Sequence, residues 1–391
     1  MTNEVLQKTA SDEQNVSSSN GLEPSIRFPK FNENYKTINL SEYLFENKDR
    51  NKSEIYTKQE VLSVSGEFGI VNQIKLQGRS FAGESVKEYH IVETNDIVYT
   101  KSPLKANPYG IIKVNKGIPG IVSTLYAVYH VKNTAFPEYI DYYFSNDLRL
   151  NKYLKPLVNI GAKHDMKVNN ETVLIGCVTF PKVEEQQKVS NFLSLIDRRI
   201  EKQRQLVESL KKYKRGALSR VFNDVLETVK LSDISNFISS ARTLSTTLNG
   251  NKGIYPVYDA AGIAGYIDYY DIDSDYITIV KDGSGVGRLQ KCDKKSSFIG
   301  TLGALVAKNC TTDFLYAVLQ TIDFSKFVTG MAIPHIYYRD YKSTLLPFPS
   351  EEKQHFISQL FKKFDIHIEN ETQKLTNMLA YKQGLLQQMF I

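Results

Sequence analysis

Several short stretches carry residue types that could act chemically on nucleic acids or metals, but each lacks part of the motif it is similar to. Gly253 to Tyr255 with Tyr266 to Asp268 has the spacing of a GIY-YIG nuclease hairpin, yet an aspartate stands where that motif closes on glycine. Asn107 to Tyr109 is similar to the loop that holds a flipped adenine in methyltransferases. Its second proline is missing, however, and no glycine-rich S-adenosylmethionine loop precedes it, so a turn is favoured.

Two further stretches lie close together in the second half of the chain. Asp271, Asp273 and Asp275 are spaced like the first half of a calcium loop, but Tyr276 occupies the position that requires glycine, which favours a solvated hairpin. Asp282 to Arg288 is glycine-rich without matching a dinucleotide-binding fingerprint. The sequence therefore argues against a self-sufficient nuclease or methylase, and we expect a non-catalytic chain without a metal site.

The glycine-rich loop is more informative as a binding element. It is flanked by Lys281, Arg288 and Lys291, so its backbone N–H groups could approach phosphates, although a tight β-turn explains it equally well. Lys and Arg, like Asn, also read base edges. A comparable loop follows a predicted strand in the first half of the chain, and two segments follow the matched glycines Gly161 and Gly330.

If the chain binds nucleic acid, these four segments supply the residues that would contact it. They are Lys101, Ser102, Lys105, Asn107, Tyr109, Lys163, His164, Lys167, Lys281, Ser284, Gly285, Arg288, Lys291, His335, Tyr337 and Arg339. The two histidines could as easily be packed loop residues.

An internal repeat indicates which elements position these segments. Phe180 to Phe222 recurs without a gap as Phe348 to Phe390, at an offset of 168 residues and with 14 of 43 positions identical. In both copies the apolar residues alternate spacings of three and four, which is a heptad seam. The seam residues are Val189, Leu193, Ile196, Ile200, Val207, Leu210, Ile357, Phe361, Phe364, Ile368, Leu375 and Met378. We expect two long helices that pair as a coiled coil; the alternative is that each helix lies on its own domain.

The direction of pairing follows from charge. A parallel, register-matched pair would place Lys214 against Lys382 inside the seam, and like charges there are costly. The sequence therefore predicts an antiparallel coiled coil.

The regions between the helices read as two diverged copies of one α+β domain. Each opens similarly, with Thr37 to Tyr43 and Thr228 to Ile234, and each continues in β-branched and aromatic runs typical of a mixed sheet. The predicted strands are 97–100, 120–129, 276–280 and 298–306, and the predicted short helices are 137–144 and 312–319. We predict a disordered leader at 1–25, domains at 26–181 and 224–349, and helices at 182–223 and 350–391.

Composition sets further bounds. The net charge is only +6, so nucleic acid would be bound through local patches. The three cysteines lie far apart without a CxxC pair, and no run of 18 apolar residues occurs. With no signal-peptide pattern at the start, we expect a soluble, cytoplasmic protein.

Both helices share the pattern P-x-x-E-x-Q, then D-x-x-I, then Y-K-x-G-x-L-x-x-x-F, and each follows a domain of its own. This architecture resembles the DNA-specificity subunit of type I restriction-modification systems, over essentially the whole chain from residue 26. The resemblance implies that each domain, a target recognition domain, reads one half of a bipartite DNA sequence. It also implies that the helices serve as spacer and docking surface for two methyltransferase subunits and two restriction subunits of a bacterial complex.

The same resemblance implies that S-adenosylmethionine, ATP and Mg are used by the partner subunits and that this chain holds no cofactor. A different class of function remains open from the residues alone, namely a coiled-coil scaffold that joins two ligand-binding domains without reading DNA.

Overall fold

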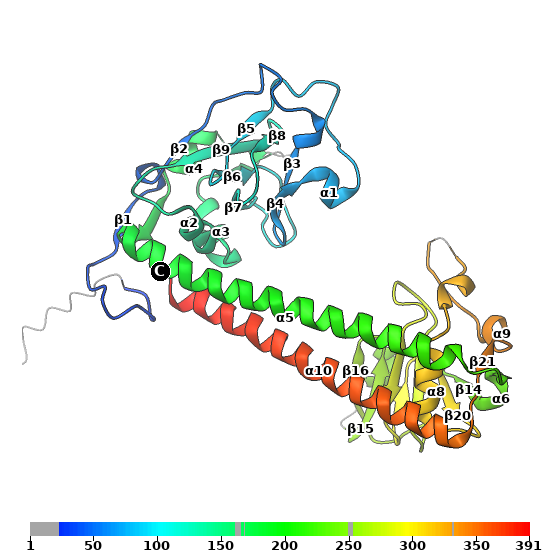
Figure 1. Cartoon of the computed structure of the whole chain (residues 1–391). Helices are drawn as coiled ribbons and strands as arrows, with labels where there is room; N and C mark the ends of the chain where they lie inside the picture. The colour runs from blue at the N-terminus through cyan, green and yellow to red at the C-terminus, as the bar shows by residue number, and fades with distance from the viewer. Residues whose placement is uncertain (1–22, 161–165, 168, 249–252, 331) are drawn as a thin grey trace, which may run out of the picture. The chain divides into compact units, whose positions relative to one another are not determined.

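The computed structural model describes residues 23–160, 166–167, 169–248, 253–330 and 332–391, which form two compact units. The first unit comprises Met1–Glu201 with Thr376–Ile391, and the second comprises Lys202–Leu375. Each unit contains one globular domain and part of two long helices, α5 (Val183–Asn223) and α10 (Glu351–Gln388) (Figure 1).

The main sheet of the first domain has four antiparallel strands in the order β2-β9-β6-β7. Their bounds are Leu44–Glu46 for β2, Tyr126–Val131 for β9, Ile97–Thr100 for β6 and Ile112–Val114 for β7. Ile97 and Tyr99 enter one apolar cluster and Val98 enters another, so the central strand β6 is covered on both faces. Helix α2 (Pro137–Phe144), which opens on a proline, packs against β7.

Smaller elements complete the first domain. β1 (Lys36–Asn39) pairs with β12 (Cys177–Phe180), which leads directly into α5. The others are η1 (Leu40–Glu42), η2 (Lys58–Glu60), β3 (Leu62–Ser65), β4 (Gly69–Asn72), α1 (Gln73–Gln77), β5 (His90–Val92), β8 (Gly120–Val122), α3 (Asp147–Leu154), β10 (Asn159–Ile160), β11 (Met166–Lys167) and α4 (Asn170–Leu174).

The second domain repeats this plan. Its four-stranded sheet has the antiparallel order β14-β20-β17-β18, with bounds Ser235–Ser239, Leu302–Ala307, Tyr276–Val280 and Leu289–Cys292. Alternate residues of the central strand β17 again enter two different apolar clusters. Helix α8 (Thr312–Leu319) takes the place of α2, and the pair β13 (Thr228–Lys230) and β21 (Leu345–Pro347) takes the place of β1 and β12.

The second domain also carries a three-stranded sheet, β16-β15-β19. Its strands are β15 (Tyr255–Asp259), β16 (Gly262–Ile267) and β19 (Ser297–Phe298). The remaining elements are α6 (Leu231–Ile234), α7 (Leu244–Leu248), η3 (Phe324–Phe327) and α9 (Tyr338–Tyr341).

The two predicted short helices have the bounds found in the structure, but two strand predictions were wrong in the same way. Residues 120–129 form β8 and β9, because a turn closed by Tyr126 N and Ser123 O separates them. Residues 298–306 are likewise divided between β19 and β20 by a turn from Leu302 N to Ile299 O. The main sheets are antiparallel rather than mixed, and among the described strands only β15 and β19 pair in parallel.

The long helices pair through their apolar seam within each unit. In the first unit, Val189 and Leu193 of α5 join one core with Leu386 and Phe390 at the end of the chain. In the second unit, Leu218 and Phe222 of α5 join the core around Ile357 and Phe361 of α10. The start of one helix thus packs with the end of the other in both units, and the predicted antiparallel pairing is confirmed. All twelve predicted seam residues are buried or half-buried.

The polar positions of the seam explain why the pairing is antiparallel. Lys382 Nζ lies 2.5 Å from Asp197 Oδ1 in the first unit, and Lys214 Nζ lies 2.5 Å from Asp365 Oδ1 in the second. These four residues are two pairs of identical positions in the repeat, so each lysine meets the aspartate of the other copy. Each lysine is thereby neutralised instead of facing its counterpart.

A second polar contact lies in the seam of the second unit. Gln203 Nε2 donates to Glu371 Oε2 at 2.7 Å, and these two residues are also counterparts at the offset of 168. In an antiparallel pair of equivalent helices, a position that faces its own counterpart marks the centre of the pairing. The register is therefore fixed by polar contacts as well as by apolar packing.

Lys214 offers a test of this register. Its Nζ also lies 2.8 Å from Gln320 Oε1, and its side chain is only 10% exposed. We expect Lys214→Met to lower the free energy of unfolding by about 2 kcal/mol, because two partly buried acceptors, Gln320 and Asp365, are left without a charged donor. Urea denaturation followed by circular dichroism measures this, with the exposed Lys363→Met as control. Equal stabilities of the two variants would contradict the role given to Lys214.

Candidate nucleic-acid interface

Two equivalent loops follow the central strands of the two main sheets. In the first domain Thr100 N bonds Ile111 O and Lys101 N bonds Leu125 O, which brings the loop after β6 back to β7. In the second domain Val280 N bonds Arg288 O and Lys281 N bonds Thr301 O, in the same relation to β17 and β18. Lys101 and Lys281 therefore occupy the same place in the fold.

In the second domain the glycine-rich loop lies against the segment that follows Gly330. Asp282 and His335 form an isolated antiparallel bridge, Gly283 N donates to Pro334 O, and Ile336 N donates to Lys281 O. The structure thus brings together two segments that are about 50 residues apart in the sequence. This contact joins most of the candidate residues of the second domain into one surface.

The side chains on this surface are of the types that contact DNA. Arg288 and Ser284 are exposed, and Arg288 Nη2 donates to Ala260 O in the β15–β16 turn. The Arg339 guanidinium lies 4.7 Å from the centre of the Tyr337 ring, which in turn contacts the His335 ring at 5.0 Å. A loop with positively charged side chains beside exposed rings can contact both phosphates and bases.

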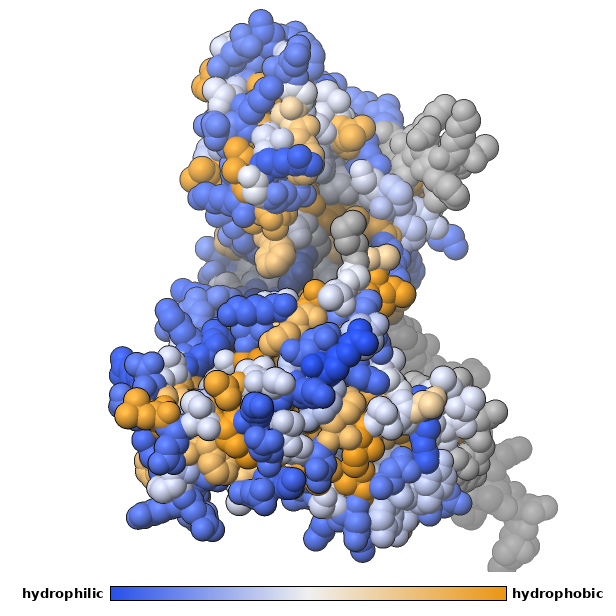
Figure 2. Space-filling model, turned by 90° about the vertical axis from the view of Figure 1, so that its right-hand side faces the viewer, coloured by the Kyte–Doolittle hydropathy of each residue, from blue (hydrophilic) through white to orange (hydrophobic). Residues whose placement is uncertain are grey.

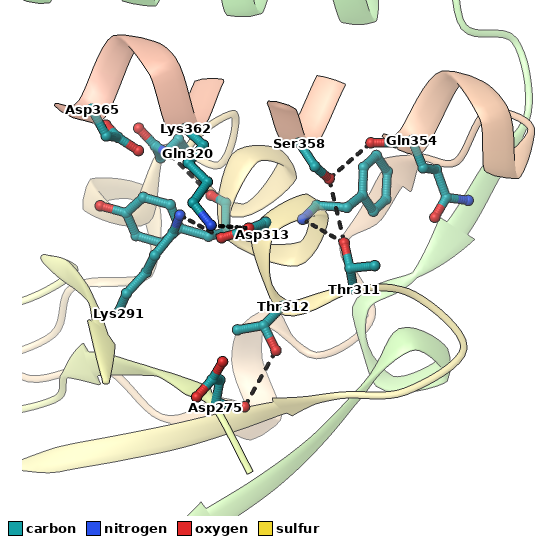
Figure 3. Close-up of polar contacts among 12 residues, drawn as sticks. Asp275, Lys291, Thr311, Thr312, Asp313, Gln320, Gln354, Ser358, Lys362 and Asp365 are labelled. Carbon is teal, nitrogen blue, oxygen red and sulfur yellow. Dashed lines mark hydrogen bonds and ion pairs between the residues drawn. The ribbon is translucent and has the colours of Figure 1, made fainter. Parts of the chain in front are cut away.

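Lys291, another predicted DNA contact, has its charge paired with a residue outside this loop. It belongs to β18 and its Nζ lies 2.7 Å from Asp313 Oδ1 near the start of α8. Lys362 of α10 approaches the same carboxylate at 3.7 Å (Figure 3). Beside this pair, the N-cap residue Thr311 contacts Ser358, whose hydroxyl donates to Gln354 O. Lys291 therefore connects β18 to α8, and Lys362 connects α8 to α10.

In the first domain the equivalent loop is only partly exposed. Ser102 and Lys105 are exposed, whereas Lys101 is half-buried and burial lowers its pKa. Asn107, also predicted to contact DNA, is buried, and its Nδ2 donates to Asp147 Oδ1 at 2.9 Å. Tyr109 is half-buried against the core, and its carbonyl accepts a hydrogen bond from Tyr99.

Three further candidates belong to the segment after Gly161. Lys163 and His164 lie outside the described residues. Lys167 is the last residue of β11, where it pairs with Asn159 of β10.

Sequence reasoning missed two arginines that follow the first strand of each main sheet. β2 and β6 both run antiparallel to β9, so their C-terminal ends lie at one edge of the sheet, where Arg50 and Lys101 follow them. The same topology places Arg242, after β14, at the edge where Lys281 follows β17. Aligning the two domains by their strand order would have revealed this correspondence.

Arg50 has an unusual neighbour in His90, with which it forms an isolated bridge. Burial lowers the pKa of His90 to about 4, and the charges of Arg50 and Lys101 add to this, so the imidazole is neutral near pH 7. Arg50 Nη1 and His90 Nδ1 are both buried without a hydrogen-bond partner among the residues that the structure describes. Polar atoms of this kind favour a bridging water molecule.

Other kinds of site find no support in the described part of the chain. No group of three or more His, Cys, Asp or Glu side chains there is arranged to hold a metal ion. Asp271, one of the three aspartates with calcium-loop spacing, is instead paired with Arg242. No described helix has the length and apolar character needed to cross a membrane. Hydrophobic and hydrophilic residues are interspersed on the face shown in Figure 2.

The fold described above, two α+β domains that are each followed by a long helix of an antiparallel pair, is similar to that of type I DNA-specificity subunits. A family model described as "Type I restriction modification DNA specificity domain" matches residues 223–379. The crystal structure of the type I restriction-modification S subunit from M. genitalium matches with a TM-score of 0.61 and 15% identity, covering 95% of this chain and 99% of that one. The resemblance predicted from the sequence is therefore confirmed, and the fold is that of these subunits.

Two curated proteins are also similar in sequence. One is the putative type I specificity subunit S.MpnORF285P of Mycoplasma pneumoniae, 28% identical over 151 residues, which are 37% of this chain and 49% of that protein. The other is the type I restriction enzyme EcoprrI specificity subunit of Escherichia coli, 26% identical over 115 residues, or 29% of this chain and 28% of that protein. The matches span about half or less of these relatives.

A second solved structure comes from a study titled as the structural basis of complex assembly and conformational transition of the type I R-M system. It has a TM-score of 0.52 and 14% identity, and it covers 90% of this chain and 96% of that one. The match to a chain from a type I assembly supports the same fold.

The structure predicts that Lys281 and Lys291 of the second domain contribute differently to DNA binding. We expect Lys281→Ala and Arg288→Ala to weaken DNA binding and to reduce the slope of log K against log salt by up to about one unit for each phosphate that is no longer neutralised. Lys291→Ala is the matched control, because its charge is already paired with Asp313. Binding isotherms at several salt concentrations give the slopes. A slope that falls for Lys291→Ala but not for Lys281→Ala would refute the assignment.

Proposed function

We propose that this protein is the specificity subunit of a type I restriction-modification complex and recognises a bipartite DNA sequence. The observation that carries this proposal is the duplication of a complete domain, with equivalent loops after β6 and β17 that present Lys101 and Lys281. Two equivalent readers with different loop sequences suit a target made of two different half-sites. In this proposal the chain acts on DNA in the bacterial cytoplasm.

Catalysis belongs to the partners in this proposal. Methyltransferase subunits with S-adenosylmethionine would modify adenine, and restriction subunits with ATP and Mg would cleave the DNA. The chain itself contributes recognition and positioning. The scaffold alternative, in which the domains bind other ligands, predicts no sequence preference on DNA.

Domain exchange separates these possibilities. Residues 26–180 are replaced by the corresponding domain of another specificity subunit, and the complex with its partner subunits is tested on random duplexes by methylation sequencing. We expect one half of the target to change and the other half to remain, because the second domain is untouched. Selection of no bipartite sequence by the unaltered complex would favour the scaffold.

The repeat also supports two copies of one partner. Two identical positions of the repeat, Tyr213 and Tyr381, are 67% and 61% exposed, although the Tyr213 ring also lies 5.8 Å from that of Phe364. Gly216 and Gly384, one turn further along each helix, have no atom within 4 Å of an added Cβ. Glycine within a helix costs about 1 kcal/mol relative to alanine, and no neighbour among the described residues requires it here.

These tyrosine and glycine pairs fit a helix of a partner that packs closely against each copy. A glycine allows two helix backbones to approach, and an exposed tyrosine next to it is a typical anchor of a protein interface. One such site in each unit supports two methyltransferase subunits per chain. Two restriction subunits would then complete the complex.

Substitutions of one glycine test this stoichiometry. We expect Gly216→Leu to reduce the number of bound methyltransferase subunits from two to one, because its side chain occupies the space of the approaching helix. Gly216→Ala is the matched control, which should keep both partners and raise the melting temperature. Native mass spectrometry counts the subunits. If Gly216→Leu and wild type bind the same number with the same affinity, the site is elsewhere.

A further inference from the structure

The side chain of Arg242 is held in one orientation by Tyr269 and Asp271, two residues of one segment of the second domain. Its Nη1 donates to the Tyr269 hydroxyl at 2.6 Å, and its Nη2 donates to Asp271 Oδ1 at 2.7 Å. The guanidinium carbon lies 4.8 Å from the centre of the Tyr269 ring. Asp271 is itself fixed, since its backbone N–H bonds Ser296 O and Ser297 Oγ.

The backbone of this arginine is held as firmly as its side chain. Gly300 N donates to Arg242 O at 2.7 Å. A Cβ on Gly300 would lie 2.9 Å from Ser240 O and 3.1 Å from Arg242 O, so only glycine permits this approach. Both the backbone of Arg242 and the plane of its guanidinium group are therefore held in place, although the side chain is still 33% exposed.

This arginine lies next to the proposed DNA-contacting loop. Gly300, which bonds Arg242, is followed by Thr301, which accepts the hydrogen bond of Lys281 N. The Tyr269 ring that contacts Arg242 is 42% exposed, and the next residue, Tyr270, is 37% exposed and packs edge-on to Tyr255 at 4.9 Å. Arg242 thus lies at the same edge of the sheet as the loop that we propose to contact DNA.

The arrangement suits a base better than a phosphate. A phosphate contact needs positive charge, which Asp271 largely cancels here. Bidentate recognition of guanine O6 and N7 instead needs a planar donor fork in a fixed orientation. Arginine has five N–H donors, and beyond the two bonds above its other donors meet no acceptor among the residues that the structure describes.

We propose that Arg242, oriented by Asp271 and Tyr269, reads a guanine in the half-site of the second domain. This inference rests on the proposed function, because it specifies one contact of the same DNA-reading surface. Tyr269 and Asp271 are positioning residues that act through Arg242. The pair of opposite charges adds selectivity with little contribution to non-specific attraction.

The test is target selection from random duplexes by the complete complex, read by methylation sequencing, with the Arg242→Lys variant. Lysine keeps the charge but not the planar fork, so we expect the preference for guanine at one position of one half-site to fall roughly ten- to a hundredfold. The salt slope of binding should stay unchanged. Arg198→Lys, on the exposed side of α5, is the matched control and should keep the wild-type preference.

Asp271→Asn provides a second measurement if the first variant folds poorly. It keeps Arg242 but removes the charge that cancels it, so the preference at the same position should weaken while the salt slope becomes steeper. A purely structural ion pair would lower the melting temperature of both variants and leave the selected sequence intact, which overturns the inference. If the wild-type complex selects no bipartite sequence, the proposed function fails instead.

Discussion

The antiparallel ion pairs between the two long helices are the contacts on which the rest of the structure depends. A repeated helix that carries both a lysine and an aspartate can neutralise itself only when its two copies run in opposite directions. Asp197 then meets Lys382 and Asp365 meets Lys214. The same groups also hold the domains: Tyr142 of α2 donates to Asp197 at 2.7 Å, and Gln320 accepts from Lys214. Pairing of the helices and packing of each domain against them therefore use the same polar side chains.

The N-terminal end of each long helix is also held by a set of buried hydrogen bonds that is the same in both copies. Gln186 and Gln354 donate to the carbonyls of Pro181 and Pro349, and the serine one turn later donates back to the glutamine carbonyl in both copies. Gln186 reaches further and accepts from Phe136 N at the start of α2. These buried groups would be costly without partners. They fix the angle at which a domain leaves its last strand and enters its helix.

Sequence alone could predict the parts of the molecule that depend on periodicity and repetition. The helix pair, its direction and the helices α2 and α8 follow from heptad spacing, charge and local propensity. The breaks before β9 and β20 were missed although Ser123 and Gly300 stand in the turns, because the apolar and β-branched residues on both sides are equally typical of one continuous strand.

The candidate site was harder to predict because its contacts are distant in sequence. Lys291 looked like part of a basic loop, but strand β18 directs it to Asp313, 22 residues away. Arg242 was missed because its partners lie 27 and 29 residues further along the chain. Side-chain direction and pairing across a sheet decide such roles, and neither can be read from local residue types.

The loops after β6 and β17 have the same conformation where they join the sheet but differ at their tips. One fold can therefore present two different DNA-contacting surfaces. Gly110 and Gly287 both adopt positive φ where the loop returns to its sheet, and a Cβ on Gly110 would meet Thr100 O. The tips differ in length and sequence, and their neighbours differ as well: Arg50 lies beside a buried neutral histidine, whereas Arg242 lies between a tyrosine and an aspartate. An arginine at the same place in the fold then presents different donors. Divergence of these supporting residues can change what a domain reads while the sheet, the core and the helix pair stay the same.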